Sequence, residues 1–164
     1  MRYLYPTNRL RKMRTLKWAF TSCLLCLATV SLSQVKNPVK WTYTANKTGP
    51  GKYTVNMKAV LEKGWHLYSQ QTPDGGPVPT QVNFTKNPLV TLSGPVKEIG
   101  KLETVFEKLF DLNVKQYSNE VTFQQNVTVK GNVKTNLAGT IEYMLCNEKE
   151  CLPPRKNPFT IALQ

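Results

Sequence analysis

Six stretches of this chain alternate apolar and polar side chains with a period of two, the pattern of a half-buried β-strand. They are rich in valine, threonine, tyrosine and phenylalanine and cover residues 39–45, 52–60, 80–85, 120–129, 137–146 and 159–163. Clusters of glycine, proline and asparagine separate them, at 48–51, 74–77, 131–132 and 153–154. Short strands at this spacing predict an all-β fold, an antiparallel immunoglobulin-like β-sandwich in a single domain.

The first 33 residues have the pattern of an export signal. A basic cluster at 9–17 precedes an uncharged apolar run at 18–30, and Ser31 and Ser33 frame a cleavage site before Gln34. The run is too short to span a bilayer, so no stable membrane insertion is expected. We therefore predict a signal peptide at 1–33 and an exported domain at 34–164, with Met13 as an alternative start. A lipoprotein signal is the less favoured alternative, because the residues before the two signal cysteines fit a lipobox poorly.

The charge of the exported domain argues against nucleic-acid binding. The chain has 22 basic and 10 acidic residues, and six of the basic ones lie in the signal, which leaves a net charge of +6. The remaining lysines are scattered and do not interleave with aromatic residues. A domain of this length buries enough surface to fold without disulfides, and we expect it to be a monomer.

The exported domain retains two cysteines, Cys146 and Cys151, in the segment CNEKECLPP. As a structural staple, a bridge closing so short a loop is worth only about 2 kcal/mol. Zinc needs three or four ligands, and the only histidine is His66, so we expect no metal and no cofactor. Copper(I) held by the thiols and Met144 is the remaining metal alternative. A thiol pair at a strand end, stopped by proline, can open and close with little disturbance of the fold, as thiol–disulfide exchange requires.

Three patches together resemble one known family. They are KGWHLYSQQ (63–71), FEKLFDLNVKQY (106–117) and CNEKECLPP (146–154). Their order and spacing are similar to those of the N-terminal periplasmic domain of the thiol:disulfide interchange protein DsbD, an immunoglobulin-like domain that carries reducing equivalents. The resemblance implies a periplasmic protein-disulfide reductase type of activity in electron transport, such as cytochrome c biogenesis. It also implies thioredoxin-like proteins as electron acceptor and donor. The family's membrane and thioredoxin-like domains are not among these residues, so the resemblance implies a separate membrane protein that delivers electrons.

The resemblance also assigns roles to individual residues. Cys151 would be the thiol that attacks in mixed disulfides, and Cys146 its resolving partner. Phe110, with Phe106 in the same patch, would cap the pair when no partner is docked.

Tyr68 and His66 would lie near the cysteine turn, although rim packing is the more ordinary role for such residues at a strand end. The sequence departs from the family pattern at Lys108 and Leu109, where an acidic pair is expected.

Two further alternatives stay open. The apolar residues of 102–117 fall near a helical spacing, which predicts either a short amphipathic helix or a loop that covers the site. Glu148 and Glu150 disfavour a thiolate and should make Cys151 slow to react with bulk oxidants. The rival function is an exported immunoglobulin-like binding module whose disulfide is only structural. Sequons at 46–48, 83–85 and 126–128 would favour a eukaryotic surface protein if they are glycosylated.

Overall fold

The computed structural model describes residues 36–131 and 133–164, in which Asn37–Gln164 form one compact unit. The expected signal peptide lies outside the described residues. Within them the chain forms strands and no helix, so no helix is present that could cross a membrane. The strands are β1 (Val39–Gly49), β2 (Lys52–Leu61), β3 (His66–Tyr68), β4 (Gln81–Phe84), β5 (Val90–Glu107), β6 (Leu112–Val129), β7 (Thr135–Tyr143), β8 (Leu145–Cys146) and β9 (Arg155–Leu163).

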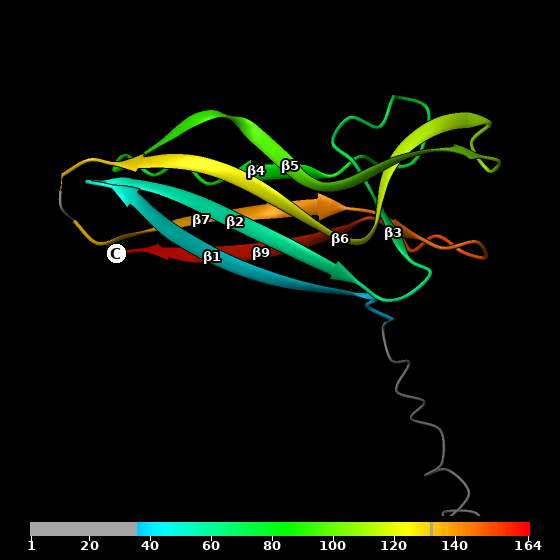
Figure 1. Ribbon diagram of the computed structural model, residues 1–164, viewed down its shortest axis with the longest axis horizontal. Coiled ribbons are helices and arrows are strands. Elements are labelled where there is room, and N and C mark those ends of the chain that lie inside the picture. The colour runs from blue at the N-terminus through cyan, green and yellow to red at the C-terminus, as the bar shows by residue number, and fades with distance from the viewer. Residues whose placement is uncertain (1–35, 132) are drawn as a thin grey trace, which may run out of the picture. The chain divides into compact units, whose positions relative to one another are not determined.

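The strands form two antiparallel sheets, which confirms the predicted sandwich (Figure 1). One sheet has the order β1-β2-β6-β3-β8, with β5 on the other edge of β6, and the second has the order β4-β7-β9. The six predicted strands are present, but the stretch 137–146 is two strands and not one. Its first part is β7 of the small sheet, and after Met144 the chain enters the large sheet as β8.

The core lies between the two sheets. Along β2, the side chains of Tyr53, Val55, Met57 and Ala59 are buried and those between them are more exposed. Such alternation is what a strand with one face on the core requires.

Aromatic side chains join the two sheets across this core. The ring of Trp41 on β1 lies 5.3 Å from that of Tyr143 on β7, and the rings of Tyr43 and Phe159 are 5.4 Å apart. Both distances lie in the range that aromatic pairs prefer.

Strand β6 positions the candidate site because it has different partners along its length. It pairs with β2 at 120–128 and with β3 at 116–118, while β5 follows its other edge. Between these two ladders Asn119 adopts a left-handed backbone, φ 66°, a conformation that asparagine tolerates better than most residues. Past this residue the hairpin of β5 and β6 curves away from the two sheets, at the end of the domain where β3 and the cysteine turn lie (Figure 1).

The helix considered for 102–117 is wrong. Strand β5 continues to Glu107, a turn follows, and β6 begins at Leu112. The residues with helical spacing include Val105 and Leu109, which are exposed. A helix would need a surface on which to bury that stripe, whereas the hairpin satisfies its backbone groups through the ladder between the two strands.

Candidate functional site

The two cysteines are joined at the base of a tight turn. Cys146 ends β8, and the disulfide links it to Cys151 with 4.1 Å between the Cα atoms. The backbone closes the same turn without the sulfurs: the Leu152 amide donates to the Leu145 carbonyl at 2.8 Å. Inside the turn, the Asn147 amide donates to the Glu150 carbonyl at 2.9 Å. The turn therefore has hydrogen bonds of its own that do not depend on the disulfide.

The two sulfur-bearing residues differ in burial. Cys146 is 1% exposed and packs with the buried side chains of Tyr68 and Val114, whereas Cys151 is only partly buried. Leu145, next in the strand, belongs instead to the main core. Cys146 therefore faces away from the side that carries Leu145, as alternation along a strand requires.

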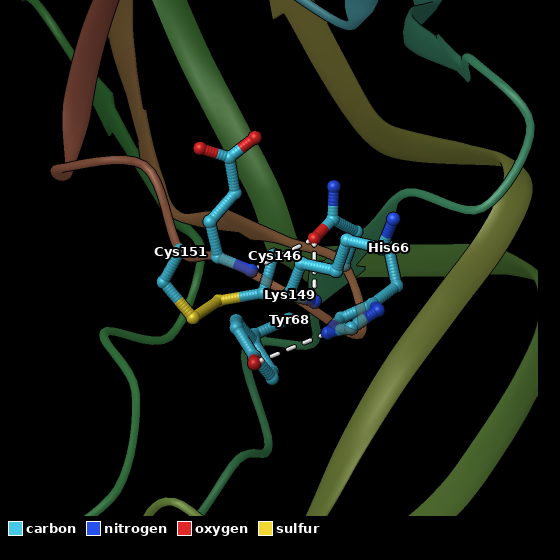
Figure 2. The surroundings of a disulfide bond; sticks show 7 residues. His66, Tyr68, Cys146, Lys149 and Cys151 are labelled. Atoms are coloured by element: carbon cyan, nitrogen blue, oxygen red, sulfur yellow. Dashed lines mark hydrogen bonds between the residues drawn. A yellow bond between two sulfur atoms is a disulfide. The ribbon is translucent and has the colours of Figure 1, made fainter.

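His66 and Tyr68, both on β3, lie beside the disulfide (Figure 2). His66 is opposite Cys146 in the ladder of β3 and β8. Its Nε2 lies 3.2 Å from the Tyr68 hydroxyl oxygen, and the two rings meet edge to face with centroids 5.2 Å apart. The site therefore contains one continuous contact from imidazole to phenol to the cysteine pair.

Burial controls the protonation of both side chains. Burial lowers the pKa of His66 below its ordinary value, and the carboxylates of Glu107 and Glu103 oppose that shift. Burial raises the pKa of Tyr68, and Glu107 adds to the rise. At neutral pH the phenol is therefore protonated and the imidazole is largely neutral.

A cavity of about 840 Å³ opens beside Cys151. One wall is the cysteine turn at 147–150, and another is the tip of the β5–β6 hairpin, with Phe106 and Leu109. Phe106 is 53% exposed and Leu109 is 73% exposed. His66 contributes to the floor of the same cavity. A disulfide with an open, partly apolar cavity beside its more exposed sulfur is accessible to a docking protein.

Phe110, the residue expected to cap the pair, lies in the turn between β5 and β6. It is partly buried in the turn after β5, where its amide donates to the Glu107 carbonyl at 3.2 Å. Within the described part of the chain it is not among the residues that line the cavity. Its role as a cap stays a prediction.

Sequence reasoning missed Gln116, which lies on β6 between Tyr68 of β3 and Glu103 of β5. It is 7% exposed and lines the cavity, and its Oε1 has no hydrogen-bond partner in the described structure. The sequence gives no sign that this glutamine is buried, because its burial depends on which face of β6 the cysteine turn covers.

The segment after β3 is held by one carboxylate. Glu98 of β5 accepts hydrogen bonds from the Ser69 hydroxyl at 2.6 Å, the Gln70 amide at 2.7 Å and the Tyr117 hydroxyl at 3.0 Å. Three donors on one carboxylate join β3, β5 and β6 at the base of the site. This contact fixes the end of β3 on which His66 and Tyr68 lie.

Comparison with solved structures supports the fold. The chain is similar to the N-terminal periplasmic domain of ScsB from Proteus mirabilis, with a TM-score of 0.54 and 20% identity. The match covers 78% of this chain and 47% of that one, so this chain spans about half the length of that relative. A weaker likeness is to the Neisseria meningitidis DsbD N-terminal domain in the reduced form, with a TM-score of 0.42, 15% identity, and coverage of 74% and 84%.

Among curated proteins none matches this chain. The family model described as thiol:disulfide interchange protein DsbD, N-terminal, matches residues 34–163. These residues include β1 to β9, the cysteine turn and the cavity beside it. The chain therefore belongs to the family of DsbD N-terminal domains.

Proposed function

We propose that this protein is a thiol–disulfide exchange module that passes reducing equivalents to thioredoxin-like proteins in the periplasm. In its reduced form the Cys151 thiolate attacks the partner's disulfide and forms a mixed disulfide. Cys146 then attacks Cys151, which releases the reduced partner and leaves the pair oxidised. A thioredoxin-like or membrane-bound donor reduces the pair again. Membership of the DsbD N-terminal family supports the general assignment.

The unequal burial of the two cysteines is the observation that carries the proposal. Cys151 borders the open cavity, whereas Cys146 is 1% exposed. An attacking thiol has to reach a sulfur of another protein, while a resolving thiol needs to reach only its neighbour. The assignment of Cys151 as the attacking thiol agrees with this asymmetry.

The backbone of the turn favours a redox role over a structural one. The hydrogen bonds of Leu152 and Asn147 hold the turn without help from the sulfurs. A bridge across so short a loop adds about 2 kcal/mol in the chain-entropy model. The disulfide can therefore open while the fold around it persists.

The acidic turn restrains reactions with bulk oxidants. Glu148 and Glu150 lie on either side of Lys149 between the two cysteines, and all three residues line the cavity. Negative charge near Cys151 raises the free energy of its thiolate. A docked partner that excludes water and contacts Phe106 and Leu109 brings its disulfide to the side of Cys151 that borders the cavity.

Trapping the mixed disulfide tests this proposal. Cys146→Ser, expressed with the signal in its native envelope, should accumulate an adduct with a thioredoxin-like protein, because the resolving thiol is absent. Cys151→Ser should accumulate much less, since the remaining thiol is buried. Non-reducing gels of both variants, with identification of the linked protein by mass spectrometry, provide the measurement.

The competing function, a binding module with a structural disulfide, predicts a different result. Neither variant would form an adduct, and the wild-type bridge would stay closed under mild dithiol. That pair of outcomes would exclude the exchange module. A bridge that equilibrates with a thioredoxin-like protein would exclude the structural staple.

A further inference from the structure

The only histidine of the chain lies at the cysteine pair. His66 is opposite Cys146 in the strand ladder and borders the same cavity as Cys151. On the other edge of β3, His66 pairs with Ser118 of β6, which carries no charge. A neutral imidazole beside a thiol pair is a group that can accept a proton near neutral pH.

Tyr68 packs against both this imidazole and the cysteine pair. Its ring packs in the small buried cluster with Cys146 and Cys151, and its hydroxyl oxygen lies 3.2 Å from His66 Nε2 (Figure 2). A phenol that keeps its proton can donate to the imidazole and accept from a thiol at the same time. Burial raises the pKa of Tyr68, so the hydroxyl remains intact over the pH range in which thiols react.

Two nearby carboxylates, those of Glu103 and Glu107, stabilise the protonated form of His66. Glu103 of β5 is held by a hydrogen bond of 2.9 Å from the Ser118 hydroxyl, and Glu107 ends the same strand. Both carboxylates raise the pKa of His66, against the larger effect of burial. The charged groups that border this cavity come from β5, the β5–β6 turn and the cysteine turn: Glu107, Lys108, Glu148, Lys149 and Glu150.

On the basis of the proposed function, we infer that His66 takes up, through the Tyr68 hydroxyl, the proton that leaves the Cys151 thiol. The thiolate attacks one sulfur of the partner's disulfide, so that a bond forms from Cys151 to that sulfur and the partner's S–S bond breaks. The electron pair leaves on the partner's second sulfur, which takes a proton from the imidazolium. Cys146 then gives its proton to His66, attacks Cys151 and releases the partner's first sulfur as a thiolate that is protonated in turn. Two electrons and two protons pass to the partner, and the pair ends as a disulfide.

The site thereby combines two opposed requirements. The glutamates of the cysteine turn disfavour a thiolate, so that the free pair is slow to react. His66 contacts the Tyr68 hydroxyl and provides a base that stays neutral until a thiol loses its proton. A nearby imidazolium then lowers the pKa of the thiol, as in other cysteine–histidine pairs.

The test follows the thiolate absorbance of the fully reduced protein at 240 nm against pH. The wild type should lose the proton of its first thiol at a lower pH than a protein without the imidazole, because thiol and imidazole interact. His66→Gln should raise the midpoint of this first thiol step by about one pH unit or more, which corresponds to about tenfold less thiolate at neutral pH. Tyr68→Phe, which keeps the ring, should shift the curve in the same direction. Lys40→Gln, at an exposed position of β1 at the other end of the strand order from β8, is the control and should titrate as the wild type does.

A second measurement needs no substitution. With any purification tag removed, His66 gives the single histidine Hε1 resonance, and its titration by NMR can be compared between the oxidised and reduced protein. The pKa of His66 should be higher in the reduced form, because a thiolate stabilises the imidazolium. Equal values in both forms, or a His66→Gln curve identical to that of the wild type, would overturn the inference. Failure of the reduced wild type to exchange with an oxidised thioredoxin-like protein at any pH would instead overturn the proposed function.

Discussion

At the scale of single residues, Asn147 determines the shape of the turn that holds the sulfurs. Its side-chain Oδ1 accepts hydrogen bonds from the Lys149 amide at 2.8 Å and the Glu150 amide at 2.9 Å. Asparagine at the start of a turn often makes such contacts with amides two and three residues on. Because the turn is shaped by this side chain, Cys151 returns to the position at which it meets Cys146.

Removing that acceptor should therefore change the redox equilibrium of the pair. Asn147→Ala leaves the two amides to water and loosens the reduced turn, so that closing the disulfide costs more conformational entropy. We expect the equilibrium constant for disulfide formation to fall about fivefold, the effect of about 1 kcal/mol. The measurement is the fraction oxidised across a series of glutathione buffers. Asn147→Asp retains an acceptor oxygen at the same position and should behave more nearly like the wild type, and an unchanged equilibrium for both variants would contradict this role.

At the scale of elements, the hairpin of β5 and β6 determines how open the site is. Past the bend at Asn119 it leaves the sandwich and borders the cavity with its tip. Val114 on its inner face is fully buried in the same cluster as Tyr68 and Cys146. Leu112, next to the tip, is partly buried against that cluster. The hairpin thus packs on the cysteine site along one face.

The position of Phe110 in this tip leads to a prediction about shielding. Phe110 is two residues before Leu112, and we predict that its ring limits access to the reduced thiols. Phe110→Ala should therefore speed the alkylation of the reduced pair by a small reagent such as iodoacetamide, followed by mass spectrometry. Asn113→Ala, an exposed change in the adjoining strand, is the matched control. An equal alkylation rate in Phe110→Ala and wild type would leave the hairpin as a docking surface without a capping role.

At the scale of the whole molecule, alternation in the sequence was sufficient to predict the sandwich. Strands such as β2 and β9 have one face on the core, and their buried residues recur with a period of two. Strand β5 has no such signal, because it lies at the edge of the sheet and most of its residues are exposed, including Ile99 at 51%. Strand β3 has three residues and is too short to show a period.

The candidate site could be predicted only in part from the sequence. The cysteine pair and His66 and Tyr68 stand in short patches whose chemistry is visible in the sequence. The cavity is not, since it depends on the bend at Asn119 and on the exchange of sheets between β7 and β8 at Met144. Both are properties of packing between segments far apart in the chain. The helical spacing in 102–117 was misleading because a strand at an edge can expose apolar residues that a helix would have to bury.

Strands β4, β7 and β9 of the small sheet pack closely around Gly139, and this packing should contribute to stability. Gly139 of β7 lies between β4 and β9, and a Cβ atom there would be 2.5 Å from the Asn83 carbonyl oxygen and 2.6 Å from Cζ of Phe159. The carbonyl belongs to a paired strand and the ring is packed against Tyr43, so neither can move without loss of other contacts. Gly139→Ala should therefore lower the free energy of unfolding by about 1–3 kcal/mol.

Chemical denaturation of the oxidised protein would measure this loss. Gly49→Ala provides the comparison, because a Cβ atom at that position would meet nothing closer than the Lys52 side chain at 3.9 Å. That variant should unfold at nearly the same denaturant concentration as the wild type. Since Gly139 lies in the small sheet and the cysteine turn follows β8 in the large one, the thiolate titration of folded Gly139→Ala should match that of the wild type. A Gly139→Ala protein as stable as Gly49→Ala would show that β4 and β9 can shift to admit a methyl group, contrary to the close packing of the strands around Gly139.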